Sequence, residues 1–330
     1  MSQETSLLVL SAVEVTALFD IDSAIESQRI AFRELGLDHA QLPARLLIDG
    51  TEGAVSFCYA ARVSADTGAV CKFGSVVPAN ARRGLPSVSA LVTALDAETG
   101  RPVAVMDGTT VTTIRTSAAS AVAAEHLANP GSSALAVLGA GVQAEAHVRA
   151  IARVLPLTQV RIWSRTADDC AALAERLRGE LGLDVAAVRS AQEAVAGADV
   201  VAGCTSSATP VFDSAWLKPG VTVISVGSFA ADRSEVPADL LTTASAVVVD
   251  DVETSLEHAG PVVAAVKAGV VEPDALIPLG AVVAGLREGR RGPRDIVYYN
   301  SVGIGVQDAA AAWMILSAAR EQGAGQTVRL

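Results

Sequence analysis

The hydrophobic pattern in the first third of the chain changes its period near residue 44. Residues 7–36 combine a short apolar run with two segments of helical period, and Ser11 and either Asp20 or Asp22 are candidate helix caps. After residue 44, apolar and polar positions alternate with a period of two, which predicts strands. Five β-like runs result, at residues 45–48, 54–61, 69–76, 87–95 and 102–106. Turn residues join these runs, so we expect an antiparallel block rather than a βαβ array.

The rest of the chain alternates between strand-like and helical segments. Residues 112–127 are rich in Ala and helical in period, and Asn129-Pro130-Gly131 interrupts them, so a domain boundary is expected there. Further β-like runs then alternate with helical segments, at residues 135–138, 159–163, 184–188, 200–203, 221–226, 246–249 and 296–299. This alternation is typical of a doubly wound, mostly parallel sheet. The last helical segment, residues 307–321, is apolar along one side.

A glycine-rich turn follows the first strand of this alternating region. The apolar run ends at Gly139, and Gly141 and Ala144 complete the spacing G-x-G-x-x-A before a helical segment. Gly139 permits a tight turn, Gly141 lets the backbone approach a pyrophosphate, and Ala144 lets the helix pack closely on the strand. Free N–H groups at the start of that helix would face the phosphates. The pattern predicts a dinucleotide-binding site.

The residues after the next strand bear on the choice of cofactor. Folds that prefer NAD carry an Asp or Glu there, which accepts hydrogen bonds from the ribose, whereas this chain has Ser164 and Arg165. A guanidinium can pair with a 2′-phosphate that a carboxylate would repel. We therefore predict NADP(H) as the preferred cofactor. NAD(H) is the alternative if Arg165 is only a solvated surface residue.

Composition excludes several classes of protein. The formal net charge of −11 and the lack of a basic cluster argue against nucleic-acid binding. No apolar run reaches the roughly 18 residues that a membrane span needs, and the first residues lack the basic region of a secretory signal. The four cysteines have no metal-binding spacing, so we expect buried thiols, no metal site and a cytoplasmic protein.

Three cations occupy unusual positions in the first half of the chain. Lys72 lies within an apolar run, Arg115 lies near the start of the Ala-rich helix, and Arg45 opens a β-like run. Each of them alone is more often a snorkelling or capping residue than a ligand. Together with a nucleotide fold, they suggest a pocket for a small carboxylate.

A series of short motifs extends this interpretation. They are Lys72-Phe73, Asp96-Ala97-Glu98-Thr99-Gly100-Arg101-Pro102, Met106-Asp107-Gly108, Arg115-Thr116-Ser117-Ala118-Ala119, Leu138-Gly139-Ala140-Gly141-Val142-Gln143-Ala144, Val226-Gly227-Ser228 and Ser301-Val302-Gly303. In this order they resemble the ornithine cyclodeaminase/mu-crystallin family over essentially the full length of the chain. The resemblance implies an α/β fold and a homodimer. A mixed α+β domain (residues 1–128 and 305–330) would bind substrate and form the dimer, and a Rossmann-type doubly wound parallel sheet (residues 129–304) would bind NAD(P).

The resemblance also assigns roles to single residues. It implies that Arg45, Lys72 and Arg115 hold the substrate carboxylate, with Lys72 near the reacting carbon. Together with the glycine-rich turn, it implies cofactor contacts at Arg115, Thr116, Gly139, Ala140, Gly141, Val142, Gln143, Ser164, Arg165, Thr166, Thr205, Ser206, Ser207, Val226, Gly227, Ser228 and Ser301.

One position departs from the family's cyclodeaminases. These enzymes carry an Asp two residues after the glycine of the Val-Gly turn, where it acts on the substrate amine, whereas this chain has Phe229. Asp232 is the candidate substitute, although it lies three residues further on. The segments 232–235 and 164–166 resemble the NADP-using reductase branch of the family instead.

These observations predict an NAD(P)H-dependent reductase of imino acids, of the ketimine reductase or amino-acid dehydrogenase type. A hydride would reach a C=N bond next to a carboxylate, and Lys72, with a pKa lowered by apolar surroundings, would donate or relay the proton. Two alternatives stay open: an ornithine cyclodeaminase that uses Asp232, and a non-catalytic, crystallin-like protein that binds NADP. The side chains expected to set specificity are Phe57, Tyr59, Phe73, Val88 and Phe229.

Overall fold

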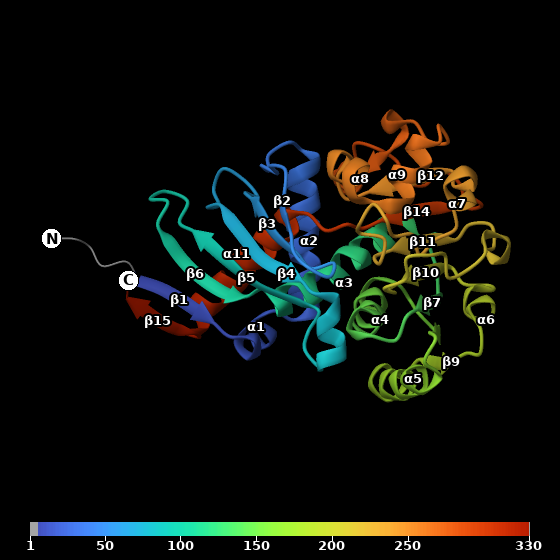
Figure 1. Cartoon of the computed structure of the whole chain (residues 1–330), viewed down its shortest axis with the longest axis horizontal. Coiled ribbons are helices and arrows are strands. Elements are labelled where there is room, and N and C mark those ends of the chain that lie inside the picture. Colours follow the sequence, from blue (N-terminus) through green and yellow to red (C-terminus); the bar gives the residue numbers. More distant parts are fainter. Residues whose placement is uncertain (1–5, 330) are drawn as a thin grey trace. The chain divides into compact units, whose positions relative to one another are not determined.

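A computed structural model of the chain describes residues 6–329, which form two compact units (Figure 1). Unit 1 comprises Met1–Arg115 and Ile304–Leu330, and unit 2 comprises Thr116–Gly303. The division between the units falls within helix α3 (Gly108–Leu127), whereas the boundary expected from the sequence lies after this helix, at Asn129. Both units contain a sheet covered by helices, but neighbouring strands are mostly antiparallel in the first sheet and parallel in the second.

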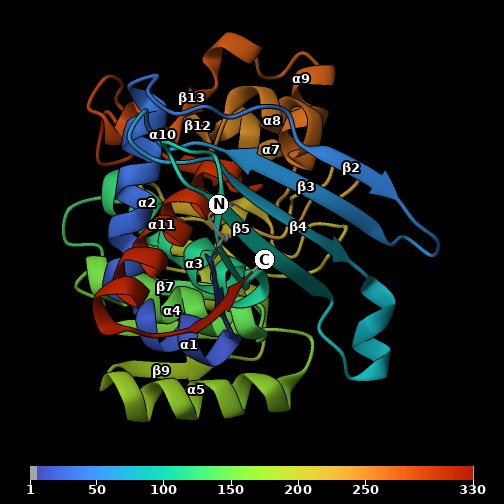
Figure 2. The same cartoon turned by 90° about the vertical axis from the view of Figure 1, so that its left-hand side faces the viewer.

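Unit 1 is built on a seven-stranded sheet in the order β15-β1-β6-β5-β4-β3-β2 (Figures 1 and 2). All neighbouring strands run antiparallel except β1 and β6, which are parallel. The strands are β1 (Ser6–Leu10), β2 (Leu46–Asp49), β3 (Val55–Ala61), β4 (Val70–Val76), β5 (Val88–Leu95), β6 (Pro102–Asp107) and β15 (Gln326–Arg329). The predicted antiparallel block is therefore confirmed as β2 to β6.

Short helices begin unit 1 and a long one closes it. In α1 (Ala12–Leu18), Ser11 and Glu14 cap each other's backbone N–H groups, and in α2 (Ile21–Gly36) the Asp20 side chain caps Ser23. The long helix α11 (Gly305–Gln322) packs against α2 and against β3, β4 and β5, and a 3₁₀ turn, η1 (Pro78–Arg83), joins β4 to β5. A Cβ at Gly305 would come within 2.9 Å of the Ala60 carbonyl oxygen, so the first turn of α11 lies close to β3.

Unit 2 is built on an eight-stranded, wholly parallel sheet in the order β13-β12-β14-β11-β10-β7-β8-β9. The strands are β7 (Ala134–Leu138), β8 (Gln159–Trp163), β9 (Asp184–Ala187), β10 (Val200–Gly203), β11 (Thr222–Ser225), β12 (Ala246–Val249), β13 (Ile277–Pro278) and β14 (Val297–Asn300). The order turns back at β7, because the chain first adds strands on one side of β7 and then on the other. The expected doubly wound α/β fold is confirmed.

Helices connect the strands of unit 2. They are α4 (Val142–Val154), α5 (Ala167–Leu181), α6 (Ala191–Val195), α7 (Asp239–Thr243), α8 (Val252–His258), α9 (Gly260–Lys267) and α10 (Leu279–Val283), with 3₁₀ turns η2 (Ser214–Trp216) and η3 (Pro273–Ala275). As predicted, α5 ends at Gly182, whose φ of 67° is left-handed. Thr166 precedes α5 as expected, but its side chain makes no capping hydrogen bond.

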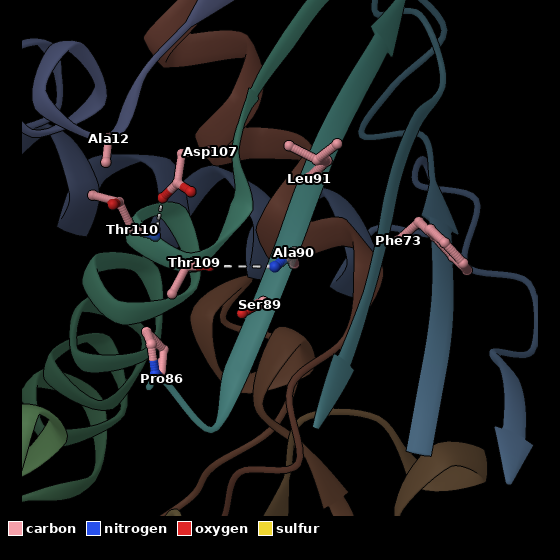
Figure 3. Close-up of a pocket in the computed structure, with 9 residues that line it drawn as sticks. All are labelled: Ala12, Phe73, Pro86, Ser89, Ala90, Leu91, Asp107, Thr109 and Thr110. Carbon is pink, nitrogen blue, oxygen red and sulfur yellow. Dashed lines mark hydrogen bonds between the residues drawn. The ribbon is translucent and has the colours of Figure 1, made fainter. Parts of the chain in front are cut away.

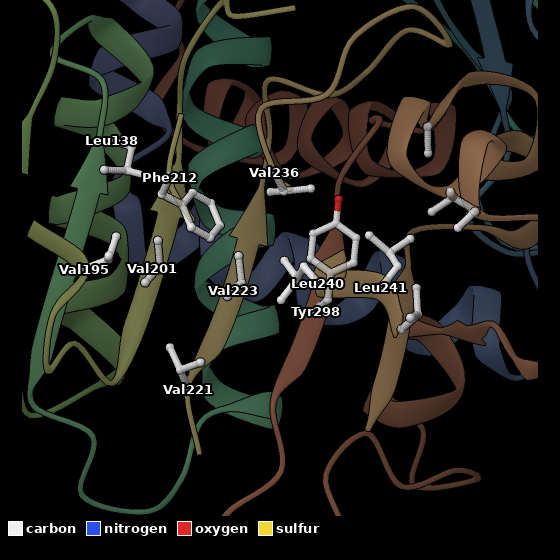
Figure 4. Close-up of a cluster of buried hydrophobic side chains, with 14 of the residues drawn as sticks. Leu138, Val195, Val201, Phe212, Val221, Val223, Val236, Leu240, Leu241 and Tyr298 are labelled. Atoms are coloured by element: carbon white, nitrogen blue, oxygen red, sulfur yellow. The ribbon is translucent and has the colours of Figure 1, made fainter. Parts of the chain in front are cut away.

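The core of unit 2 explains the apolar strand sequences. Figure 4 shows Leu138 of β7, Val201 of β10 and Val223 of β11 in one cluster of buried apolar side chains, which also contains Phe212 and Leu240 from the connecting segments. Strands buried on both faces need apolar side chains at every position, which produces continuous apolar runs instead of alternation. Within residues 6–329 no helix is both long enough and apolar enough to cross a membrane.

Candidate functional site

Lys72 and Arg115 share one carboxylate in unit 1. Lys72 lies in β4 with its side chain 1% exposed, and its Nζ forms an ion pair with Asp308 Oδ2 at 2.7 Å. Arg115, in α3, donates from Nε to Asp308 Oδ1 at 3.1 Å and from Nη1 to Gln307 Oε1 at 3.1 Å. Asp308 and Gln307 belong to the first turn of α11, so the end of the chain supplies the partners of both cations.

Aromatic side chains of β3 complete the surroundings of Lys72. Tyr59 is the cross-strand partner of Lys72, and its ring centre lies 5.1 Å from Nζ, while that of Phe57 lies 5.7 Å from Nζ. Arg45 Nη1 donates to the Tyr59 hydroxyl at 3.3 Å, and the guanidinium lies 5.5 Å from the ring centre. We call Arg45, Lys72 and Arg115, with the side chains that contact them, the cation cluster.

The cation cluster carries unused hydrogen-bond donors and excess positive charge. Lys72 and Arg115 share Asp308, which is the one carboxylate that contacts either of them in the described residues, and the charge of Arg45 also acts on Lys72. Arg45 Nε and Gln307 Nε2 are buried and donate to no acceptor within residues 6–329. Buried donors without partners are costly, and cations attract an anion, so the arrangement suits a carboxylate-bearing ligand.

Burial changes the acidity of Lys72. Removal from water lowers the pKa of the Lys72 ammonium to about 8, and the positive charges of Arg115 and Arg45 act in the same direction. Asp308 opposes them and raises the pKa, through its charge and its contact with Nζ. A lysine with a pKa near 8 can release a proton close to neutral pH, as a general acid must.

Two side chains expected to set specificity lie apart from Lys72 in the sheet. Phe73 follows Lys72 in β4, so its side chain points to the opposite face of the sheet, where it is 57% exposed. Val88 lies at the start of β5 opposite Val76, four residues from Val92, the cross-strand partner of Lys72. Phe57 and Tyr59 are the expected specificity residues that contact Lys72.

The opposite face of the unit 1 sheet carries an exposed apolar row. Leu46, Cys58, Phe73 and Leu91 are successive cross-strand partners across β2, β3, β4 and β5. The side chains of Leu46 and Leu91 are 66% and 55% exposed. Exposed apolar side chains in a contiguous row indicate an interaction surface. We call this the outer row.

The cysteines in β3 and β4 correct one expectation from the sequence. Cys170 is buried as expected, but Cys58, Cys71 and Cys204 are partly exposed, and the sulfur atoms of Cys58 and Cys71 lie 3.4 Å apart. Alternation along the two strands turns Cys58 and Cys71 to the face opposite Tyr59 and Lys72.

An open hollow of about 590 Å³ is also present in unit 1 (Figure 3). Asp107 caps Thr110 N at the start of α3, and the Thr109 hydroxyl accepts from Ala90 N. Phe73 and Leu91 of the outer row help to line the hollow, and none of the three cations does. The lining residues are Ala12, Phe73, Pro86, Ser89, Ala90, Leu91, Asp107, Thr109 and Thr110.

In unit 2, the glycine-rich turn joins β7 to α4 as the sequence predicted. Gly139 has a φ of 123°, and a Cβ there would come within 2.5 Å of the Cys204 carbonyl oxygen. A Cβ at Gly141 would meet nothing within 4 Å, and no side chain caps the first turn of α4. Ala144 is fully buried. The open space at Gly141 and the uncapped amides fit a dinucleotide pyrophosphate.

Residues 164–166 follow β8 with the side chains available for a ligand. Ser164 Oγ accepts from Thr166 N at 3.2 Å, which holds the turn. Arg165 is exposed and makes no hydrogen bond or ion pair with the part of the chain that the structure describes. Its guanidinium is therefore available for an anion.

Glu235 connects the loops that follow β10 and β11. This carboxylate is 0% exposed and accepts from Thr205 N at 2.9 Å, Thr205 Oγ1 at 2.7 Å and Ser225 Oγ at 2.9 Å. It also accepts from Val226 N at 3.1 Å and from Gly227 N at 2.6 Å. The sequence predicts that both loops bind the cofactor, so Glu235 holds the backbone of that predicted site in place.

Asp250, which follows β12, has a similar role for the loop that follows β14. It is fully buried and accepts from Val302 N at 2.8 Å, Gly303 N at 2.7 Å and Ser301 Oγ at 3.2 Å. Ser301 was a predicted cofactor contact. Asp250 thus fixes the backbone at a third loop of unit 2.

The segment after β11 places Asp232 away from any such network. Asp232 is exposed in a turn, whereas Arg233 donates to the Ser206 carbonyl oxygen at 3.0 Å and lies 5.5 Å from the Phe229 ring centre. Nothing described around Asp232 gives it the buried, hydrogen-bonded surroundings of Glu235.

Asp308, Gln307, Glu235 and Asp250 were not predicted as site residues. The sequence holds one signal for the first two, because a polar pair stands in the otherwise apolar first turns of the last helix. Such a pair in a buried helix needs polar partners. Arg115 lies 193 residues from Asp308 along the chain, and Lys72 lies further still, so the sequence alone could not identify these partners.

The parallel sheet, the strand–glycine turn–helix at β7 and α4, and the open, uncapped start of α4 define a dinucleotide-binding protein of the Rossmann class. The chain belongs to the ornithine cyclodeaminase/mu-crystallin family, whose model matches residues 5–323. The resemblance noted from the sequence motifs is confirmed.

Relatives at about 30% identity span essentially the whole chain. A Delta(1)-pyrroline-2-carboxylate reductase of Bacillus cereus is 30% identical over 324 residues, which cover 98% of this chain and 99% of the relative. The structure of Thermococcus litoralis Delta(1)-pyrroline-2-carboxylate reductase in complex with NADH and L-proline has a TM-score of 0.93 at 31% identity, covering 97% of this chain and 100% of that one. An archaeal alanine dehydrogenase dimer with bound NAD has a TM-score of 0.93 at 30% identity, covering 98% and 99% of the two chains.

Proposed function

We propose that this protein is an NAD(P)H-dependent reductase of imino acids, which delivers a hydride to a C=N bond next to a carboxylate. The observation that carries the proposal is the cation cluster, where buried cations outnumber carboxylates and donors lack acceptors. The similarity to reductases of a cyclic imino acid supports the same reaction class. Unit 1 is then the substrate-binding domain and unit 2 the NAD(P)-binding domain.

Each cation has a part in this proposal. Arg45 and Arg115 bind the carboxylate with charge-assisted hydrogen bonds and so fix the orientation of the adjacent C=N bond. The bound nicotinamide cofactor supplies the hydride. Lys72 Nζ holds the proton that the substrate nitrogen takes, and the rings of Phe57 and Tyr59 keep water away from this ammonium. The proposed cofactor contacts are the residues predicted from the sequence, at 115–116, 139–143, 164–166, 205–207, 226–228 and 301.

Purified protein, NADPH or NADH and a small substrate panel test the reaction. The panel contains pyrroline-2-carboxylate, piperideine-2-carboxylate, and pyruvate with ammonia or methylamine. We expect cofactor absorbance to fall with at least one imine. Release of ammonia from L-ornithine with NAD⁺ and no net absorbance change would instead indicate the cyclodeaminase, which Phe229 and the exposed Asp232 disfavour. Tight cofactor binding without turnover of any substrate would indicate the binding protein.

NADP(H) is the cofactor that Ser164 and Arg165 favour. The exposed guanidinium of Arg165 is available for a 2′-phosphate, and the turn holds no acidic side chain that would repel one. Replacing Arg165 by Ala should lower kcat/KM for NADPH about 10- to 100-fold, as expected for loss of a charge-assisted hydrogen bond, and leave NADH almost unaffected. Arg189→Ala, another exposed arginine of unit 2, is the matched control. A wild-type protein that prefers NADH would contradict the proposal.

The outer row of unit 1 supports a homodimer. Its exposed apolar side chains would be covered by the same face of a second copy, and the similar alanine dehydrogenase is described as a dimer. Sedimentation should give a dimer for the wild type and a monomer for the double variant Phe73→Glu, Leu91→Glu. Leu286→Glu, at an exposed leucine of unit 2, should stay dimeric. A monomeric wild type would overturn this assignment.

A further inference from the structure

Asp308 occupies a central position in the cation cluster. Its two oxygens are divided between two cations, with Oδ2 2.7 Å from Lys72 Nζ and Oδ1 3.1 Å from Arg115 Nε. The side chain is 1% exposed. A carboxylate with one oxygen on each cation fixes the separation and direction of both.

The ammonium of Lys72 has more N–H donors than acceptors around it. Lysine has three N–H donors. One is donated to Thr112 Oγ1 at 3.2 Å, whose own hydrogen goes to the Gly108 carbonyl oxygen, and Asp308 Oδ2 forms an ion pair with Nζ at 2.7 Å. The other contacts of Nζ within the described residues are with the rings of Phe57 and Tyr59. The geometry therefore leaves one N–H for a ligand.

We propose that Asp308 is a positioning residue, which aims Lys72 and Arg115 at the substrate and keeps a proton on Lys72 Nζ for transfer to the substrate nitrogen. This proposal rests on the proposed reductase function. Asp308 acts through Lys72 and Arg115, which are the two cations it contacts.

Reduction of a C=N bond to an amine takes one hydride and one proton. The π bond breaks, the carbon gains a hydride from the nicotinamide cofactor, and the nitrogen gains the proton of Lys72 Nζ. The product is the amine, the cofactor is oxidised, and Lys72 is left neutral until it takes a proton from water. Lys72 can donate again only if its surroundings favour the charged form.

Charged groups on several elements act on Lys72, and one of them favours its protonated form. Arg115 from α3 and Arg45 from the segment before β2 disfavour the charged form, as does burial against the rings of β3. Asp308 from α11 is the carboxylate that opposes them. Loss of its charge should lower the pKa of Lys72 by about 1–3 units, which is the usual effect of a neighbouring opposite charge.

The titration of Lys72 can be measured without any substrate. The sequence has three lysines, Lys72, Lys218 and Lys267. Protein labelled with ¹³C at lysine Cε should therefore show three signals, and the variant Lys72→Arg identifies that of Lys72. We expect Lys72 to titrate near pH 8 in the wild type and at clearly lower pH in Asp308→Asn. An unchanged titration in Asp308→Asn overturns the proposal, whatever the enzyme's activity.

The pH dependence of imine reduction connects the titration to chemistry. In the wild type, kcat/KM should fall as pH rises through about 8, because Lys72 loses its proton. Asp308→Asn should move this fall to lower pH by the same interval as the NMR titration. Asp308→Glu, which keeps the charge, should restore the wild-type pH while remaining slower. An NMR shift without a kinetic shift refutes the role in proton transfer.

Two further outcomes test whether Asp308 acts through Lys72 and whether the reductase function itself holds. Asp308→Asn should cost less activity in the Lys72→Met background than in the wild type, because the part of Asp308 that acts through Lys72 is already lost there and only its contact with Arg115 remains. An equal loss in the two backgrounds would show that Asp308 acts independently of Lys72 and contradict the proposal. If the wild type reduces no imine but the NMR titration of Lys72 shifts in Asp308→Asn, the proposed reductase function is wrong. The effect of Asp308 on the pKa of Lys72 is then still supported.

Discussion

Asp308 of unit 1 and Glu235 of unit 2 are both buried carboxylates, but they are stabilised differently. Asp308 lies between two cations, Lys72 and Arg115. Glu235 contacts no cation in the described part of the chain and accepts instead from three backbone N–H groups and two hydroxyls. One carboxylate balances charge, and the other holds loop backbone in place.

The difference determines what each unit can do when the carboxylate is lost. Lys72 can respond to the loss of Asp308 by releasing its proton, which removes an uncompensated buried charge. The N–H groups of Thr205, Val226 and Gly227 have no such response, because a backbone amide cannot give up its hydrogen. We therefore expect unit 2 to be the less tolerant of a neutral replacement.

The largest effect is expected for Glu235→Gln. The amide nitrogen of Gln would face an N–H donor, so at least one buried backbone N–H is left without an acceptor, and two N–H groups are brought together. The free energy of unfolding should fall by about 3 kcal/mol. Chemical denaturation measures this loss, and cofactor titration should show weaker binding in the same variant. Wild-type stability in Glu235→Gln would contradict the backbone role, and Glu253→Gln, in the first turn of α8, is the control.

A buried imidazole gives the second test, because unit 2 offers His147 no counter-charge either. Its Nδ1 lies 2.7 Å from the Gln143 carbonyl oxygen and its Nε2 lies 2.8 Å from Ser120 Oγ. Burial lowers the pKa of His147 to about 4. The unfolded chain takes up the proton near pH 6.5, so stability should fall below that pH, by about 2 kcal/mol at pH 5.

The variant His147→Gln separates this contribution from general acid effects. Its unfolding free energy should depend less on pH between 6.5 and 5 than that of the wild type. Replacement of His39, an exposed histidine of unit 1, is the control substitution. Parallel curves for the wild type and His147→Gln would count against a neutral, buried imidazole.

The last effect, which varies most with pH and is smallest above pH 8, is expected for the stability of Asp308→Asn. The pKa of Lys72 is about 8 in the folded chain, below its ordinary value of 10.5, so Lys72 makes folding less favourable while it is charged. In Asp308→Asn, Lys72 becomes neutral at lower pH. The stability difference between wild type and variant should therefore narrow as pH rises to about 8 and stay constant above. A constant difference from pH 6 to pH 9 would contradict this.

The sequence predicted most strands of both sheets, because their signal is local. Each predicted run in unit 1 lies within one residue of its strand, since apolar alternation reflects which face is buried. It missed β15, whose residues are polar and mostly exposed, and the two-residue β13. Each of these strands forms by pairing with the edge strand of a sheet, β1 for β15 and β12 for β13. The local pattern of apolar residues holds no information about such a partner.

The candidate site was predicted in part for the same reason. Lys72 and Arg115 are conspicuous as cations in apolar surroundings, and the structure brings both to one cluster with Arg45. Asp308 was missed because its meaning depends on partners in distant segments. Glu235 was missed because its partners are mostly backbone N–H groups, which every residue except proline possesses.

Chain order gives α11 a consequence for folding during synthesis. The ribosome synthesises the whole of unit 2 before it makes α11 and β15, although both belong to unit 1. Until then β3, β4 and β5 lack the helix that covers them, and Lys72 and Arg115 lack their counterion. Domains in general fold as they emerge. Here the first unit to begin synthesis is the last to be completed, so a chain truncated after residue 303 and released from the ribosome should hold a folded unit 2, whereas the sheet of unit 1 should be exposed and protease-sensitive.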